Sequence, residues 1–259
     1  MPSKDLRNIT DDWPHMPGQI NVRKIRGEDR RVKIQMRLDL GLLQMEESGR
    51  PDGVRPHDRE SLLEHHRQRI AEHRDRDGTD LGYALTPEEC REIREEALQY
   101  YQRYLANFAL EDYAAVARDT RRNLDVLNLC TKYAEEDDDR YGLEQYRPYI
   151  LMMHARSQAL LAMQTDAFRT ALAHVERALT QIKAFFKKFG AARAYRSSAE
   201  VQALRALRKE IRRHLPVDPV RRLEKKLAKA VADERYEDAA RLRDELDTLR
   251  GQNNDPNVA

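Results

Sequence analysis

The sequence predicts a mainly α-helical protein, with a short antiparallel β-meander at its N-terminus, a body of helical hairpins and a further α-hairpin at its C-terminus. Three observations lead to this fold class. Charged residues make up 36% of the 259 residues, above the roughly 25% typical of globular domains. Gly and Pro, which interrupt helices, number only ten each. From about residue 57 onward, apolar residues recur at helical spacing.

Residues 1–56 form the first predicted region, a tail followed by the small meander. The run from Val32 to Leu38 alternates apolar and polar residues, which is the period of a half-buried strand. A similar run starts at Ile20, and residues 40–45 either continue the strand or begin a third one. Because a sheet this small is not stable alone in water, we expect its apolar face to rest on a helix.

Residues 57–215 form the predicted helical body. The segment 58–74 is mostly polar, so we expect a surface helix or one that docks weakly. Thr86-Pro87, with Glu89 three residues after the threonine, is a helix start signal that combines a capping box with a proline at the first helical position. This helix runs to about Ala106.

Four more helices are expected in the body. One follows Asp112 and ends at the acidic run Glu135–Asp139, which we expect to be a solvated loop because its like charges repel. The others start near Pro148, span roughly 166–186 and follow Ser198.

Two stretches of the body, ALEDYAAVARDTRRNL and MQTDAFRTALAHVERAL, share a pattern. An aromatic residue is followed three residues later by a small apolar one and, seven residues further on, by another small position: Tyr113, Val116 and Asn123 in the first stretch, Phe168, Ala171 and Ala178 in the second. Both resemble the second half of a tetratricopeptide (TPR) repeat, which implies stacked helical hairpins. They lie 55 residues apart rather than the roughly 34 of TPR arrays. Ordinary antiparallel helices are therefore the alternative.

Residues 216–250 form the predicted C-terminal hairpin, and 251–259 a disordered tail. Asp218-Pro219 is a helix start signal, and two amphipathic segments follow, separated by a break at residues 233–235. Helices this short, with one apolar stripe each, leave apolar surface exposed as an isolated pair. The hairpin is therefore expected to bind a partner surface, on its own chain or on another.

The string YEDAARLRDELDTL in this hairpin is similar to the UvrB/UvrC (UVR) motif, in which an aromatic and an acidic residue precede two small residues, a leucine and an Arg-Asp pair. The resemblance implies association between proteins, usually by pairing of two hairpins into a four-helix bundle, and it implies neither nuclease nor helicase chemistry. The residues that occupy the motif positions are Leu223, Leu227, Ala230, Tyr236, Glu237, Ala239, Ala240, Leu242, Arg243, Asp244, Leu246 and Leu249.

No catalytic, cofactor or metal site is predicted. The sequence contains neither a G-x-x-x-x-G-K-[ST] phosphate loop nor a G-x-S-x-G nucleophile elbow. His65, His66 and His73 are interpreted as surface histidines, since the last two lie about 10.5 Å apart along a helix, too far for one ion. Asp137–Asp139 lack the spaced ligands of a calcium loop. We therefore expect a protein that is not an enzyme.

Composition indicates a cytoplasmic protein. The net charge is only +2, no apolar stretch approaches the length of a membrane span, and residues 1–18 lack the apolar core of a signal peptide. Cys90 and Cys130 lie far apart in the sequence and fit no metal spacing, so free thiols in a reducing compartment are expected.

One basic segment is a candidate binding surface. Between Lys183 and Arg213 there are ten Lys/Arg residues against two acids. Few aromatic residues interleave with them in the sequence, which argues against stacking sites for single-stranded nucleic acid. The expected contact residues, for phosphates or for an acidic partner, are Arg205, Arg208, Lys209, Arg212 and Arg213.

The leading hypothesis is a non-catalytic adaptor or scaffold, in which the helical body holds one protein and the hairpin binds another UVR-motif protein or a second copy of itself. The alternative is a nucleic-acid-associated accessory factor linked to nucleotide excision repair, with the basic helix on the phosphate backbone. Nucleic acid is the less favoured partner, and no membrane partner is expected.

Overall fold

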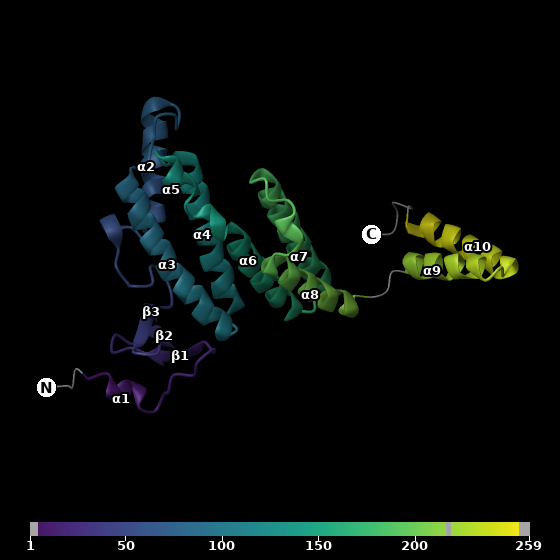
Figure 1. Ribbon diagram of the computed structural model, residues 1–259, viewed down its shortest axis with the longest axis horizontal. Helices are drawn as coiled ribbons and strands as arrows, with labels where there is room; N and C mark the ends of the chain where they lie inside the picture. The colour runs from purple at the N-terminus through teal and green to yellow at the C-terminus, as the bar shows by residue number, and fades with distance from the viewer. Residues whose placement is uncertain (1–4, 216–218, 254–259) are drawn as a thin grey trace. The chain divides into compact units, whose positions relative to one another are not determined.

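The computed structural model describes residues 5–215 and 219–253. The chain divides into two compact units, Met1–Ile211 and Arg212–Ala259 (Figure 1). The predicted N-terminal region 1–56 is therefore not a unit of its own, because its sheet packs into the same unit as the helical body. No helix in the described ranges is long and apolar enough to cross a membrane.

The N-terminal sheet is an antiparallel meander, as predicted, with strand order β1-β2-β3. A short helix, α1 (Arg7–Thr10), precedes its strands, which are β1 (Asn21–Arg26), β2 (Val32–Arg37) and β3 (Leu42–Glu46). Residues 42–46 thus begin a third strand. Ile34 of β2 is opposite Lys24 on one side and Met45 on the other.

Both faces of β2 are covered, which corrects the expectation of a half-buried strand. On one face, Ile34, Met36 and Met45 pack against Ala106 of the helical body, as expected for a sheet too small to stand alone. On the other face, Lys33 and Gln35 are also buried. Their polar atoms are satisfied within the sheet region: the Lys33 ammonium donates to Asp29 at 2.7 Å and also to Glu46, and the Gln35 amide donates to Gln44 at 2.9 Å.

The helical body follows the order predicted from the sequence. Helix α4 packs against both α3 and α6, and α6 also packs against α7. The capping box at Thr86 is present, with Glu89 at its third position. The helices are α2 (Leu62–Asp77), α3 (Pro87–Ala109), α4 (Tyr113–Tyr133), α5 (Asp137–Tyr141), α6 (Arg147–Met163), α7 (Phe168–Lys188) and α8 (Ala199–His214), with 3₁₀ turns at Pro56–Asp58, Glu144–Tyr146 and Ala194–Arg196.

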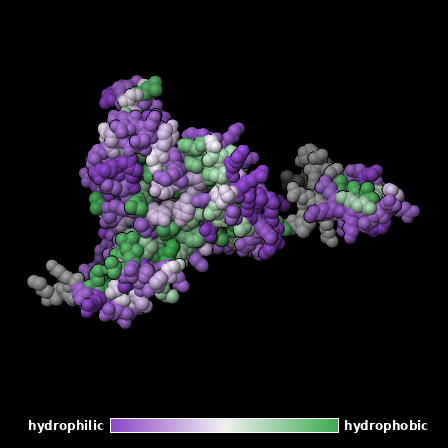
Figure 2. All heavy atoms as spheres, in the orientation of Figure 1, coloured by the Kyte–Doolittle hydropathy of each residue, from purple (hydrophilic) through white to green (hydrophobic). Residues whose placement is uncertain are grey.

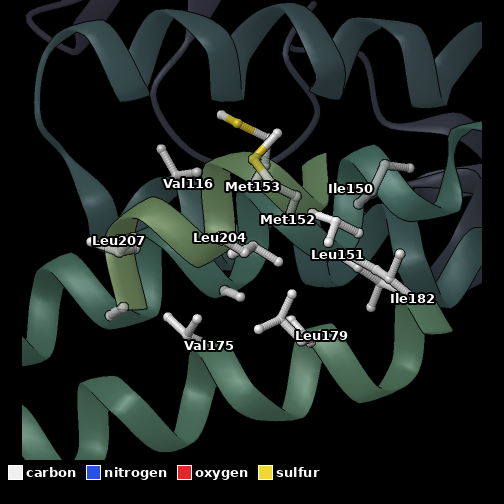
Figure 3. Packing of buried hydrophobic residues seen from close by; sticks show 14 of the residues in the cluster. Val116, Ile150, Leu151, Met152, Met153, Val175, Leu179, Ile182, Leu204 and Leu207 are labelled. Atoms are coloured by element: carbon white, nitrogen blue, oxygen red, sulfur yellow. The ribbon is translucent and has the colours of Figure 1, made fainter. Parts of the chain in front are cut away.

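The largest core lies where α4, α6, α7 and α8 meet (Figure 3). Helix α7 contributes Ala171, Val175, Ala178 and Ile182, spaced three or four residues apart so that they share one face. Helix α8 contributes Val201, Leu204, Leu207 and Ile211, which also share one face, and α6 is buried on several sides. The two small residues of the TPR-like stretch at α7 are thus core residues at helix crossings.

Two sequence expectations for the body are wrong. Helix α2 does not dock weakly, because Leu62, Leu63 and Ile70 are buried in a second core with α3 and α4. The acidic run is not a solvated loop, because its second half forms α5, where Asp139 is buried and pairs with Arg94. In both cases a residue distant in sequence supplies the covering surface or the opposite charge, and the local pattern contains no sign of it.

Buried charges hold the segment between β3 and α2 against α3 and α4. The Arg103 guanidinium donates to both carboxylate oxygens of Asp119, at 2.7 and 2.8 Å, and both side chains are about 1% exposed. Arg103 also donates to the carbonyl oxygens of Glu46 and Gly49, at 3.0 and 2.8 Å. The fully buried Glu96 accepts from the Leu62 amide at 2.9 Å. These bonds satisfy groups that would be costly if buried alone.

Candidate protein-interaction surface

The C-terminal unit contains a two-helix hairpin, α9 (Pro219–Ala232) and α10 (Tyr236–Asn253). Helix α10 extends three residues past the predicted end of the hairpin at 250. Residues 254–259 of the predicted tail and the Asp218 cap lie outside the described residues. The helices are joined by a tight turn in which Glu234 adopts the left-handed conformation, with φ of 56°.

This turn is the same as the turns of the two TPR-like hairpins of the body. In the C-terminal hairpin, the Arg235 amide donates to the Ala230 carbonyl, five residues back, at 2.8 Å. The corresponding bonds join Asp112 to Asn107 and Ala167 to Ala162, each at 2.9 Å. A left-handed residue followed by such a bond is a Schellman motif, which satisfies the last carbonyls of the first helix.

The residues around the turns also correspond. Glu111 and Asp166 are left-handed, with φ of 58° and 56°. An aromatic residue opens the second helix of each hairpin, and the residue three positions later is buried: Tyr113 and Val116, Phe168 and Ala171, Tyr236 and Ala239. The pattern that resembles TPR repeats is therefore shared by three hairpins of this chain, and membership of the TPR family remains a prediction.

The inner faces of α9 and α10 pack on each other. Of the residues that occupy UVR positions, Leu223, Ala230, Ala239 and Leu246 are buried. Leu227, Leu242 and Leu249 are half-buried. The small Ala230 and Ala239 lie next to the turn, where a small side chain lets the two helices approach closely.

Part of the apolar surface of the hairpin stays uncovered next to the turn. Tyr236 is 70% exposed and Val231 is 49% exposed, and Ala240 is exposed one helical turn after Tyr236 on the same side of α10. Ala230 of α9 is buried whereas its neighbour Val231 is not, so the apolar surface of α9 extends beyond its contact with α10. Figure 2 shows hydrophobic side chains gathered on the hairpin within a hydrophilic surround. Glu237, Arg243 and Asp244 are also exposed.

The two helices of the hairpin carry opposite charge. Helix α9 has five Lys/Arg residues and one Glu, whereas α10 has five acidic residues and three Arg. Glu237 and Asp238 lie in the first turn of α10, where the helix dipole favours negative charge. Local ion pairs, such as Arg235 with Asp238 at 3.0 Å, are exposed to solvent. The hairpin thus presents one basic and one acidic helix.

The predicted basic stripe lies on α8. Arg205, Lys209, Arg212 and Arg213 are exposed and Arg208 is half-buried. Few aromatic residues interleave with this segment in the sequence, but two of its cations lie beside aromatic rings. The Arg205 guanidinium lies 5.5 Å from the ring centroid of Tyr195, and the Lys188 ammonium lies 5.3 Å from that of Phe189. The aromatic residues come from the α7 end and from the loop before α8.

The histidines at 65, 66 and 73 do not form one site, and no group of side chains suited to a metal ion occurs in the described parts of the chain. His66 is not on the surface as expected. It is 2% exposed, its Nδ1 lies 3.1 Å from the Tyr83 hydroxyl, and burial lowers its pKa to about 4. His65 stacks on His57, with ring centroids 3.9 Å apart.

Cys90 and Cys130 are free thiols, and both are buried. The fold brings them together from α3 and α4, where they form a hydrogen bond. That hydrogen bond and burial raise the pKa of the Cys130 thiol. Their proximity could not be inferred from their separation in the sequence.

Comparison with curated proteins and with solved structures finds no match for this chain. One family model does match, and it covers only the C-terminal hairpin, with its tight turn, packed small residues and exposed tyrosine. The chain carries a UvrB/uvrC motif (UVR) at residues 218–252.

Proposed function

We propose that the protein is a non-catalytic adaptor that binds another protein through its C-terminal hairpin, while the helical body holds a second partner. The observation that carries the proposal is the uncovered apolar patch of Val231, Tyr236 and Ala240 on a hairpin whose inner face is already packed. An exposed tyrosine beside small apolar residues is typical of a protein-binding surface.

The charge of the hairpin indicates the chemistry of its partner. When a second hairpin of this kind packs in antiparallel orientation, each basic α9 lies against an acidic α10, and the four helices form a bundle. Opposite charges then face each other twice, which favours this pairing over a parallel one. The partner proposed for the hairpin is therefore another UVR hairpin, from a second copy of this chain or from another protein.

The proposal assigns no reaction to the chain. Its support lies in the sequence, which contains no phosphate loop and no nucleophile elbow. The UVR resemblance adds to it, because the motif itself implies association rather than chemistry. A cytoplasmic location remains part of the proposal.

Association through the patch is tested with the full chain by light scattering. Ala240→Asp places a charge beside Tyr236, on the exposed side of α10, so the hairpin itself is expected to stay folded. We expect the molar mass of the Ala240→Asp chain to be that of a monomer at concentrations where the unmodified chain associates. Thr248→Asp, at an exposed position two turns further along α10, is the matched control. An unchanged mass for Ala240→Asp, with unchanged circular dichroism, would count against hairpin pairing.

A charge exchange tests the partner's chemistry. One variant carries Lys225→Glu, Lys226→Glu and Lys229→Glu, which make α9 acidic; these three lysines are exposed. A second variant makes α10 basic, through changes at the exposed residues Glu237→Lys, Glu245→Lys and Asp247→Lys. Each alone should lose self-association, and an equimolar mixture should regain it. Failure of the mixture to associate would remove charge pairing from the proposal.

A second candidate is an accessory factor that binds nucleic acid through α8, supported by the exposed stripe on that helix. Neutralised phosphates release counterions, so affinity would fall steeply with salt concentration. A salt titration of DNA binding tests this candidate, together with charge reversal at Arg205, Arg208 and Arg212. This second candidate function is rejected if the chain shows no affinity for DNA that depends on salt concentration.

A further inference from the structure

Aromatic side chains are concentrated around two adjoining pockets of the helical body. One pocket, of about 560 Å³, is lined by Tyr101, Tyr104, Tyr146 and Tyr149. The other, of about 450 Å³, is lined by Tyr141, Phe185, Phe186 and Phe189. Gln145 lines both, so the two pockets are neighbours, and together we call them the aromatic groove. Both volumes are in the range of pockets that hold a ligand or a large side chain.

The rim of the aromatic groove is uncovered. Leu98 is 57% exposed, Tyr146 53%, Tyr141 43% and Phe189 41%, although each is a large apolar or aromatic residue. Within the unit Met1–Ile211 the neighbouring helices already pack on one another, so these side chains are not left over from an incomplete core. Contiguous exposed aromatics at the mouth of a pocket are typical of anchor sites in protein recognition.

Two cations flank the Phe-lined pocket. The Lys188 ammonium lies 5.9 Å from the ring centroid of Tyr141, on one side. On the other side, Phe186 lies 6.3 Å from Tyr195, whose ring is covered by the Arg205 guanidinium. No ion pair of the described side chains involves Lys188 or Arg205, and the Glu144 carboxylate, whose charge acts on Lys188, is itself paired with Arg147. Their charges are therefore available to acidic groups of a partner.

The geometry of the rings favours a protein partner over a nucleic acid. Phe189 packs edge to face on Tyr141, with an interplanar angle of 85°, and contacts Phe185 with centroids 4.7 Å apart. Rings that cover each other in this way do not offer the parallel open faces on which bases stack. Glu144 and Glu200 also line this pocket. The Glu144 carboxylate is paired with Arg147, and the Glu200 carboxylate accepts from the Ser198 hydroxyl at 2.6 Å, so neither cancels the charge of Lys188 and Arg205.

We propose that the aromatic groove binds an acidic peptide segment of a partner protein through bulky apolar anchor residues. One anchor side chain enters the Phe-lined pocket beside Phe189, and a second enters the tyrosine-lined pocket beside Tyr146. Acidic residues flanking the first anchor contact Lys188 and Arg205. This site lies on the unit Met1–Ile211, and it stands whether or not the C-terminal hairpin pairs.

The test is selection from a displayed library of random short peptides on the immobilised full chain, followed by fluorescence anisotropy of the enriched sequences. We expect enrichment of peptides that combine Phe, Trp or Leu with Asp and Glu. Replacing the apolar anchor of an enriched peptide by Ala should weaken binding at least about tenfold. A single-stranded oligonucleotide is measured in the same assay as the competing class of ligand.

Two sets of variants locate the site. Phe189→Ala should weaken the selected peptides about tenfold, whereas Leu81→Ala, which removes an exposed side chain near the start of α3, should not. The double variant Lys188→Glu, Arg205→Glu should no longer enrich peptides that contain Asp and Glu when the selection is repeated. Arg169→Glu, at an exposed position of the same α7 helix, should keep it.

Three outcomes overturn the proposal. One is a selection that enriches no peptides, or enriches peptides without apolar anchors. Another is binding that is unchanged by Phe189→Ala, which would place the contact elsewhere. The third is tighter binding of the oligonucleotide than of every selected peptide. None of them alters the light-scattering test of the hairpin, so failure of the groove and failure of the adaptor proposal are distinguishable.

Discussion

The hairpin α3–α4 of the body and the hairpin α9–α10 share a turn and differ in what surrounds it. Both turns have a left-handed acidic residue, Glu111 or Glu234, and both place an aromatic residue at the start of the second helix. In the body, residues of α3 and α4 are buried in clusters that they share with α6 and α2. In the unit Arg212–Ala259, Tyr236 stays 70% exposed. The same turn therefore lies beside a core in one region and beside an exposed apolar patch in the other.

The two hairpins also differ in how they use charge. Helices α3 and α4 are joined by the buried pair of Arg103 and Asp119, which requires complementary atoms at a defined place. The C-terminal hairpin has exposed pairs such as Arg241 with Asp238, which contribute little to folding. Its charge is instead divided between two helices, with α9 basic and α10 acidic.

The largest effect is expected from Asp119→Ala. This change leaves the Arg103 guanidinium buried without its carboxylate, and the free energy of unfolding should fall by about 3–5 kcal/mol. Urea denaturation followed by circular dichroism measures it. Asp238→Ala in the C-terminal hairpin is the control, with an expected loss of roughly 0.2–1 kcal/mol because its ion pairs are exposed. Similar losses for both variants would contradict the distinction drawn between the hairpins.

The next effect is expected from Glu234→Pro. Proline holds φ near −65°, whereas the turn requires 56° at this position, so the C-terminal hairpin should lose about 3 kcal/mol or more and unfold. Helical circular dichroism should fall and association should be lost, while the melting temperature of the body stays unchanged. Glu234→Gly, which fits the left-handed conformation, is the control. A lowered melting temperature of the body would show that the two units do not fold independently.

Acidification should lower the stability of the helical body and have less effect on that of the hairpin. Burial lowers the pKa of His66 and of His154 to about 4, below the ordinary value of 6.5. The unfolded chain therefore binds protons that the folded body does not, so stability is lost as the pH falls from about 6.5 towards 4. The sequence from 219 to 253 contains no histidine, so this loss does not apply to the hairpin.

Differential scanning calorimetry at pH 7 and pH 5 checks this expectation. The transition of the body should move to lower temperature at pH 5, and His66→Gln should reduce the shift by removing one of the buried histidines that titrate. An equal shift in the variant and in the unmodified chain would assign the acid sensitivity to other groups.

The smallest effect is expected at the left-handed turn residues of the body. Glu111→Gly and Asp166→Gly should each stabilise the body by about 0.5–1 kcal/mol, because glycine adopts a positive φ without strain. Glu95→Gly, at an exposed position within α3, should destabilise it by about as much. Thermal melts measure the three variants. Destabilisation by Glu111→Gly would show that its side chain does more than occupy the turn.

Short-range signals were sufficient to predict much of the fold. The capping box at Thr86, the alternation from Val32 to Leu38 and the turn at 233–235 each lie within a few residues, and each predicted its element. The UVR motif is equally local, since its spacing describes one hairpin. Its recognition depended on no contact outside residues 218–252.

The sequence by itself determined the order of the strands and of the longer helices and the presence of the UVR hairpin, because caps, periodicity and turn chemistry act between near neighbours. Only the tertiary structure decided which polar residues are buried. No local pattern predicts the burial of His66 and Arg103, whose partners, Tyr83 and Asp119, lie 16 or more residues away in the sequence. It also decided that aromatic residues from α3, α5 and α7 line adjoining pockets. Burial and charge pairing depend on atoms brought together from distant parts of the chain, and spacing along the sequence does not encode that proximity.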